Sequence, residues 1–113
     1  MANTNMATAS SIYGGCAQVN LTTSYQTLLT TASSKIIRIN SIIVSNIDGA
    51  NACDVTIEVN SVAIAKTVSV PADSSLVVIS KDTGLYLLEG IVLRAYASAN
   101  SDLSMTVCYE EIG

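Results

Sequence analysis

The strongest constraint on the fold lies in residues 34–60, SKIIRINSIIVSNIDGANACDVTIEVN, where two runs rich in β-branched residues flank a cluster of turn formers. The first run is largely apolar on both parities, which is typical of a strand inside a sheet. The second run alternates, so its valines and isoleucine are expected to face inward, whereas Asp54, Thr56 and Glu58 are expected to face water. The Asn, Asp and Gly residues between the runs favour a loop. Residues 34–60 therefore predict a strand, a loop and a second strand.

Turn signals and short apolar segments continue along the chain on both sides of this pair. Asn60 and Ser61 predict a two-residue turn, after which VAIAKTVSV at residues 62–70 forms the returning strand of a hairpin. Further strands are expected at residues 19–21, 25–29, 76–80, 85–88, 91–98 and 103–109. Residues 76–80 are apolar on both parities and are therefore expected inside a sheet. No long segment has the periodicity of a helix.

This succession of short strands and turns predicts an all-β chain that folds as a single-domain antiparallel β-sandwich. At 113 residues, the chain has the length of one domain that can bury a core without metals or disulfides. Half of its residues are apolar but none is Phe or Trp, so Ile, Val, Leu and Ala must fill that core. A jelly roll is one candidate order of the strands, and the pattern leaves that order open.

The surface of the predicted domain carries little charge. Only 12% of the residues are charged, against about 25% in an ordinary soluble domain, and the formal net charge is −4. Ser, Thr and Asn take the place of charged residues, which gives weak protection against association. We therefore expect a homo-oligomer, with a trimer as the working guess. Five basic residues scattered along an acidic chain exclude a phosphate-binding stripe, so nucleic acid is not an expected partner.

Residues 1–11 are small, polar and uncharged, which by itself is typical of a disordered tail. Such a segment becomes ordered by docking, and we expect it to dock on a neighbouring subunit rather than on its own domain. Gly14 and Gly15 are interpreted as a flexible joint. This divides the chain into an N-terminal arm, residues 1–15, and a β-sandwich domain, residues 16–113. The candidate subunit-interface residues are Met1, Asn3, Asn5, Met6, Ile12 and Tyr13.

The start of the chain and its apolar runs also predict a location. The first residues lack the basic and apolar regions of a secretory signal, and no apolar run approaches the length of a membrane span. We therefore expect a soluble chain that is made in a cytosol and has no membrane partner.

Candidate catalytic and metal-binding groups are few. The chain has no histidine, which excludes Ser-His-Asp and Cys-His catalysis and removes the commonest metal ligand. The carboxylates lie in turns or on outward parities, and Glu110 and Glu111 are interpreted as a solvated chain end. Cys16, Cys53 and Cys108 are widely spaced and odd in number, so we expect reduced, half-buried thiols rather than disulfides or a zinc site. No catalytic, cofactor-binding or metal-binding residue is predicted, and the chain is not expected to be an enzyme.

Two other features could hold a ligand. Residues 46–51 offer oxygen ligands but lack the spaced acidic residues of a calcium-binding loop, so turn chemistry explains them. The five tyrosines are spread along the chain and are expected at the margin of the core or at interfaces. A glycan-binding or receptor-binding surface formed by residues 48–51 and 82–84 is the alternative from the class of binding modules.

Five segments carry a family resemblance: SNIDGANACDVTIEV, VPADSSLVVISKD, LEG, ASANSDL and the terminal CYEEI. Across about residues 23–112, the chain resembles small virion structural proteins of tailed bacteriophages, especially those of marine and cyanobacterial hosts. The resemblance implies a β-sandwich within the particle, and it brings no active residues with it.

Within the particle, the resemblance favours a capsid decoration (cement) protein whose N-terminal arm clamps neighbouring capsid subunits. A neck-, tail- or fibre-associated subunit with a receptor-binding or glycan-binding module is the alternative. Either position implies assembly in the host cytoplasm and a final location in the virion. The expected partners are the major capsid protein or other virion subunits.

Overall fold

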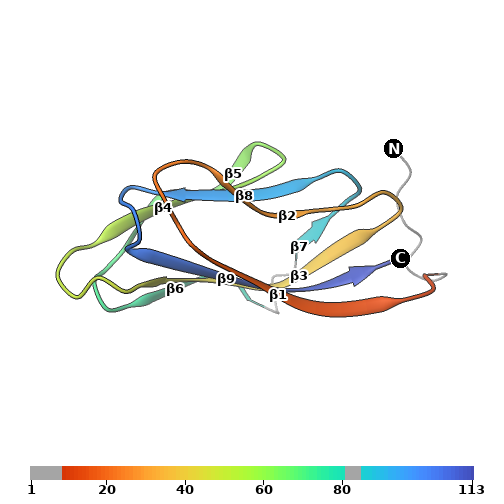
Figure 1. Ribbon diagram of the computed structural model, residues 1–113, viewed down its shortest axis with the longest axis horizontal. Coiled ribbons are helices and arrows are strands. Elements are labelled where there is room, and N and C mark those ends of the chain that lie inside the picture. The colour runs from red at the N-terminus through yellow and green to blue at the C-terminus, as the bar shows by residue number, and fades with distance from the viewer. Residues whose placement is uncertain (1–8, 81–84) are drawn as a thin grey trace.

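The computed structural model describes residues 9–80 and 85–113, which form two antiparallel sheets packed face to face (Figure 1). The first sheet has the order β1 (Ile12–Asn20), β9 (Leu103–Ile112), β3 (Ile36–Asn46) and β6 (Ser75–Ile79), and β7 (Leu85–Leu87) also pairs with β3. The second sheet has the order β2 (Gln26–Thr30), β8 (Val92–Ala97), β4 (Cys53–Val59) and β5 (Val62–Val70). The predicted all-β sandwich is confirmed.

The strand pairings are those of one long hairpin that has been rolled up. β4 pairs with β5 at the tip, and away from the tip β3 pairs with β6 and β7, β2 with β8, and β1 with β9. Rolling adds β9 beside β3 and β8 beside β4, which completes the two sheets. β6 and β7 pair with the same edge of β3 and so act as two halves of one strand. This order is that of a jelly roll, the candidate that the sequence pattern left open.

The tip of the rolled hairpin is the two-residue turn that the sequence predicts. Asn60 and Ser61 both have positive φ, at 52° and 62°, which is the geometry of a type I′ turn. Because this turn matches the twist of its flanking strands, it sets the register of β4 and β5 locally.

β3 is an interior strand, as predicted, because β9 lies on one edge and β6 and β7 lie on the other. Its apolar character on both parities has a cause that the sequence did not indicate. The extra residue Asn40 interrupts the register with β9, and this bulge switches the parity of the inward side chains. Ile37 and Ile39 are buried before the bulge, and Ile42 and Val44 are buried after it.

Aliphatic side chains fill the space between the two sheets. The largest fully buried ones are Leu21, Ile37, Ile39, Ile42, Val44, Val55, Ile57, Val70, Leu87, Leu93, Leu103 and Met105. Removing each such side chain from water contributes about 1.5–3 kcal/mol, so this core supplies the main drive for folding.

Two predictions for β4 and β6 are wrong. Thr56, expected to face water, is buried, because β5 bulges opposite it and the N–H of Thr67 donates to Thr56 Oγ1 at 3.0 Å. β6, expected inside a sheet, is an edge strand whose only strand partner within the described residues is β3, and its Val77 is 58% exposed. The apolar pattern of β6 therefore reflects partial burial of one face and exposure of the other.

Replacing Thr67 by Gly is expected to raise the free energy of unfolding by about 1 kcal/mol. Thr67 has a φ of 47°, a left-handed conformation that strains a β-branched residue and that glycine adopts freely. Urea unfolding of T67G and of the control T67A measures the effect, because alanine keeps the Cβ that causes the strain. Equal stabilities of the two variants would contradict the assignment of strain to Thr67.

β1 begins at Ile12, so residues 12–15, assigned to the arm, belong to the first sheet. Gly14 and Gly15 lie in a continuous register with β9, and the flexible joint predicted there is wrong. The ring of Tyr109 covers Gly15, since a Cβ on this glycine would lie 2.8 Å from it. Glycine is thus used here for close approach within a sheet.

The base of the arm is tied to the other end of the chain. The hydroxyls of Ser10 and Ser11 donate to the carbonyl oxygen of Gly113 at 3.1 and 2.9 Å, and the N–H of Gly113 donates to the carbonyl of Ser11 at 3.0 Å. Residues 1–8 of the predicted arm lie outside the described residues.

Candidate functional site

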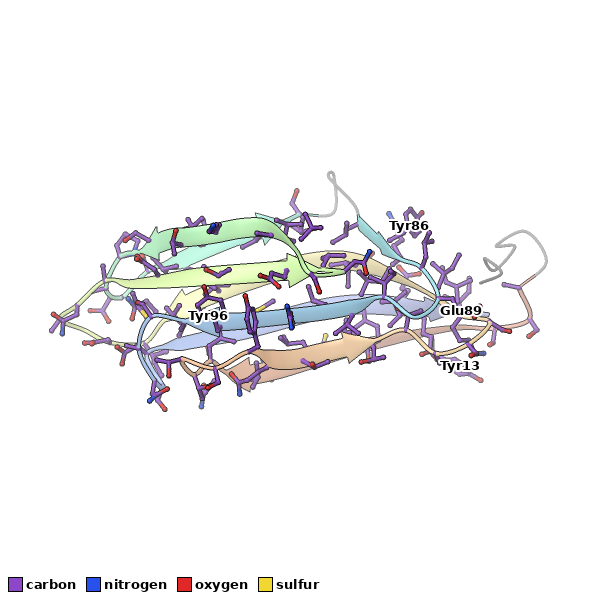
Figure 2. All side chains as sticks on the ribbon, turned by 90° about the horizontal axis from the view of Figure 1, so that it is seen from above. Tyr13, Tyr86, Glu89 and Tyr96 are labelled. Atoms are coloured by element: carbon purple, nitrogen blue, oxygen red, sulfur yellow. The ribbon has the colours of Figure 1, made fainter. Side chains whose placement is uncertain are left out.

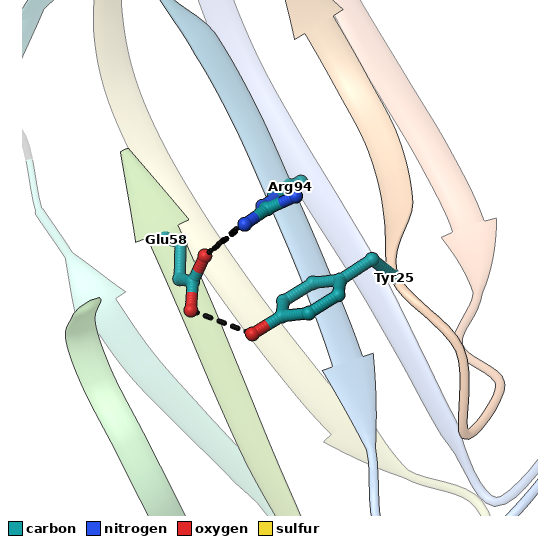
Figure 3. A network of polar contacts seen from close by, with 3 residues as sticks. All are labelled: Tyr25, Glu58 and Arg94. Carbon is teal, nitrogen blue, oxygen red and sulfur yellow. Dashed lines mark hydrogen bonds and ion pairs between the residues drawn. The ribbon is translucent and has the colours of Figure 1, made fainter. Parts of the chain in front are cut away.

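Three polar side chains from distant parts of the sequence meet on the outer face of the second sheet (Figure 3). Glu58 of β4 and Arg94 of β8 are directly opposite in the register of these strands, so their side chains share a face. Tyr25 lies just before β2 and reaches across β8 to Glu58. We call Tyr25, Glu58 and Arg94 the outer-face cluster.

Both carboxylate oxygens of Glu58 accept hydrogen bonds within this cluster. The Tyr25 hydroxyl donates to Oε2 at 2.7 Å, and Nε and Nη2 of Arg94 donate to Oε1 at 3.0 and 2.8 Å. The guanidinium carbon of Arg94 lies 4.0 Å from the centre of the Tyr25 ring, which is a cation–π contact. The Glu58 side chain is only 13% exposed, so the ion pair is partly shielded from solvent.

The same contacts set the protonation states of the cluster. The hydrogen bond from Tyr25, and then those from Arg94, lower the pKa of Glu58, and the bond to Glu58 raises the pKa of Tyr25. Glu58 is therefore ionised and Tyr25 protonated across the neutral range. A carboxylate held in this way is a poor general acid or base near pH 7. The cluster is better suited to shaping a surface than to transferring protons.

Replacing Glu58 by Gln is expected to lower Tm by about 3 °C at pH 7, with a difference that shrinks in acid. The pKa of Glu58 lies below its ordinary value of 4.5 in the folded chain, so the ionised group stabilises the fold above that pH. This contribution is lost as the pH falls through the folded pKa. Thermal unfolding of both proteins between pH 7 and pH 3 measures it, and a difference that does not change with pH would contradict this role for Glu58.

Tyr96 of β8 adds a second ring beside the cluster. Its centroid lies 4.7 Å from that of Tyr25 with the planes at 78°, an edge-to-face pair, and Tyr25 is 47% exposed. The two tyrosines are far apart in the sequence, so their spacing gave no sign of this pair. Arg94 and Tyr96 are two residues apart in a strand, so the sequence could have indicated that they share a face. The approach of Tyr25 depends on the pairing of β2 with β8, which no local pattern contains.

A depression of about 210 Å³ adjoins the outer-face cluster at Arg94. Its lining residues are Thr27, Asn60, Ser61, Gly90, Val92 and Arg94. The hydroxyl, amide and guanidinium groups of this lining can donate and accept hydrogen bonds. Beside the exposed ring of Tyr25, they could hold a ligand rich in hydroxyl groups.

The predicted subunit-interface residues fall into two groups. Ile12 and Tyr13 are 62% and 65% exposed on β1, and Figure 2 shows Tyr13 toward the same end of the sandwich as Tyr86. The other four, Met1, Asn3, Asn5 and Met6, lie outside the described residues. The interface is therefore still a prediction, with an accessible surface at its two described members.

The loop between β3 and β4 is held by its own hydrogen bonds, as the turn chemistry predicts. Asp48 Oδ1 accepts from the N–H of Ala50 at 2.8 Å, and this bond is the main reason that the pKa of Asp48 is lowered. Among the residues that the structure describes, no three Cys, Asp or Glu side chains are placed to hold a metal ion together. Residues 82–84, the other half of the alternative glycan-binding surface, lie outside the described residues.

The three cysteines are free thiols in different surroundings. Cys53 is buried, and its sulfur lies 3.3 Å from the hydroxyl of Ser98. Cys16 and Cys108 are directly opposite each other in β1 and β9, with their Sγ atoms 2.9 Å apart. Spacing along the sequence misses this pair, because it arises from the pairing of the first strand with the last.

Exposed valines lie along β5 and β6. Both are edge strands, and they contact each other on one side of the sandwich (Figure 2). Val62 and Val68 share the inner face of β4 with Val59 and Val55, yet they are 66% and 36% exposed. Val77 of β6 pairs with Ile43, so it lies on the outer face of the first sheet, where it is 58% exposed. We call Val62, Val68 and Val77 the apolar margin.

Comparison with known proteins assigns no family to this chain. Neither a protein-family model nor a curated protein matches the sequence. Within residues 9–80 and 85–113, no helix is long and apolar enough to cross a membrane.

Proposed function

We propose that the chain is a non-enzymatic virion structural protein of a tailed phage, and specifically a capsid decoration protein. It binds the major capsid protein and clamps neighbouring subunits with its N-terminal arm. The apolar margin carries this proposal, because valines on the two neighbouring edge strands β5 and β6 are exposed where another subunit would cover them. The low surface charge and the resemblance to phage virion proteins support it.

The base of the arm, Ser10 and Ser11, precedes β1 and so lies on the side of the sandwich opposite the apolar margin. β1 and β2 are the outer strands on one side of the two sheets, and β5 and β6 are the outer strands on the other. A subunit that reaches one neighbour through its arm and packs on another through its margin makes a heterologous contact. Such contacts close into a ring when the rotation between subunits allows it. This arrangement favours a cyclic homo-oligomer on the capsid, with a trimer as the proposed state.

Retention on particles tests this proposal. Capsids stripped of the chain are incubated with three proteins: Val62→Lys, a variant that lacks residues 1–9, and the control Thr30→Lys. Thr30 is exposed on the opposite edge strand of the same sheet. The deletion spares Ser10 and Ser11, whose bonds to Gly113 are kept, so the domain should stay folded.

A charge at the apolar margin and the loss of the arm are each expected to weaken binding about tenfold or more, equivalent to about 1.4 kcal/mol. The Thr30→Lys control should bind like the wild-type chain. Binding of both test variants at wild-type affinity would contradict the proposal. Circular dichroism of each variant establishes that the sandwich is folded.

The outer-face cluster favours a second function, receptor or glycan binding on a neck, tail or fibre. The exposed ring of Tyr25 offers a stacking surface, and the adjoining depression offers hydrogen-bonding groups. Binding to a glycan array that Tyr25→Ala abolishes without unfolding the chain would support this function. An array without binding by the folded wild-type chain would argue against it.

A further inference from the structure

The first and last strands bring two thiols together on the outer face of the first sheet. Cys16 and Cys108 are directly opposite, and their Sγ atoms are 2.9 Å apart. Opposed residues of an antiparallel pair have Cα atoms about 4.5 or about 5.5 Å apart, and both separations lie within the range of about 4.4–6.8 Å found in disulfides. The sulfurs need to approach by only about 0.9 Å to reach a bond length of about 2.05 Å.

We propose that Cys16 and Cys108 are a disulfide-forming pair that staples β1 to β9 when the chain meets a low-molecular-mass disulfide such as oxidised glutathione. The pair is a modification site created by the fold, since 92 positions separate the two residues in the sequence. Cys53 is buried away from them in β4, so it takes no part in the reaction.

The surroundings of the pair admit such an oxidant. Cys16 is exposed and Cys108 is half-buried. Two residues before Cys16, a Cβ added to Gly14 would meet no atom within 4 Å, so that side is open. Two residues after it, Gln18 donates a hydrogen bond of 3.2 Å to Thr106, and both line a depression of about 320 Å³. Cys16 is therefore the thiol that the oxidant reaches first.

The reaction is two successive thiol–disulfide exchanges. The thiolate of Cys16 attacks one sulfur of oxidised glutathione, which forms a mixed disulfide and releases one glutathione thiolate. The thiolate of Cys108 then attacks Sγ of Cys16 and releases the second. The chain loses two electrons and two protons, the released thiolates take up the protons, and the oxidant is reduced to two thiols.

The bond would secure an edge strand of the first sheet. β1 is an edge strand, and within the described residues its only strand partner is β9. A disulfide that closes such a long loop restricts the unfolded chain and so stabilises the folded one. The base of the arm would then be covalently joined to the strand that ends the chain, whatever partner the arm meets.

The full chain incubated with oxidised glutathione tests this inference by alkylation, digestion and mass spectrometry, together with thermal unfolding. We expect a peptide pair joined through Cys16 and Cys108, an alkylated Cys53, and a Tm raised by about 10 °C that a reductant reverses. The control Cys53→Ala should still form the bond. Cys108→Ser, which lacks the second thiol, should instead accumulate glutathione on Cys16.

Three results would overturn the inference. One is a stable glutathione adduct on Cys16 of the wild-type chain, which would mean that Cys108 cannot reach it. Another is a disulfide between two chains in place of the internal one. The third is an internal disulfide that leaves Tm unchanged or lowers it, which would mean that the strand pair must distort to form the bond.

Discussion

Replacing Asn46 by Asp should lower the free energy of unfolding by about 3 kcal/mol at pH 7. Asn46 ends β3 and is 3% exposed. Its Nδ2 donates to the carbonyl oxygens of Asn51 and Val70 at 3.0 and 2.9 Å, and its Oδ1 accepts from the N–H of Asp48 at 2.9 Å. Aspartate keeps the shape and the acceptor, but it turns a negative oxygen toward two carbonyl oxygens. One buried amide thus joins the end of β3, the following loop and the end of β5.

Urea unfolding at pH 7 and pH 4 measures the effect of the Asn46 substitution. The loss should be smaller at pH 4, where a protonated carboxyl group can donate one of the two bonds. Asn20→Asp makes the same change in charge at an exposed position and should change stability by less than about 0.5 kcal/mol. Equal losses in the two variants would contradict the role given to Asn46.

Ile42→Ala should lower the free energy of unfolding by about 4 kcal/mol, whereas Ile43→Ala should lower it by about 1 kcal/mol. The bulge at Asn40 turns Ile42 into the core, where it is fully buried, and turns its neighbour Ile43 toward the outer face. The two variants remove the same atoms from adjacent positions, so each is the control for the other. Urea unfolding of both measures the difference.

Comparing the stability losses of Ile42→Ala and Ile43→Ala tests whether β3 contains the bulge. Without an extra residue at Asn40, unbroken alternation from Ile37 and Ile39 would place Ile43 inside and Ile42 outside. A larger loss for Ile43→Ala than for Ile42→Ala would therefore contradict the register described for β3 and β9.

Features that depend on neighbouring residues could be predicted from the sequence. Asn60 and Ser61 tolerate positive φ and sit between two β-branched runs, which specified the tip of the rolled hairpin. The β-branched run at residues 36–44 specified an interior strand. The bulge within this run could not be predicted, because polar residues such as Asn40 and Ser41 also occur in strands that have no bulge.

Features that depend on strand pairing could not be predicted. The outer-face cluster needs the registers of β2 with β8 and of β8 with β4, and the two thiols need the pairing of β1 with β9. The flexible joint at Gly14 and Gly15 was a reasonable interpretation of two glycines, but β9 supplies a partner strand, and the ring of Tyr109 covers Gly15. Long-range pairing thus decided every surface on which a function is proposed.

The jelly roll separates these surfaces from one another. The base of the arm and the paired thiols belong to the β1 side, and the apolar margin belongs to the β5 and β6 side. The outer-face cluster belongs to the exposed face between β2 and β4. One subunit could therefore bind a neighbour on each side and leave the cluster accessible. This separation is what a decoration protein needs, and it also permits a binding module on the same scaffold.

The most direct test of the proposed function is quantitative mass spectrometry of virions purified from an infected culture that produces the chain. The account predicts that the chain is a component of the particle, with a copy number comparable to that of the major capsid protein. A copy number far below that of the capsid protein would instead favour the neck, tail or fibre. Absence of the chain from purified virions, with the capsid protein detected, would contradict a virion structural role.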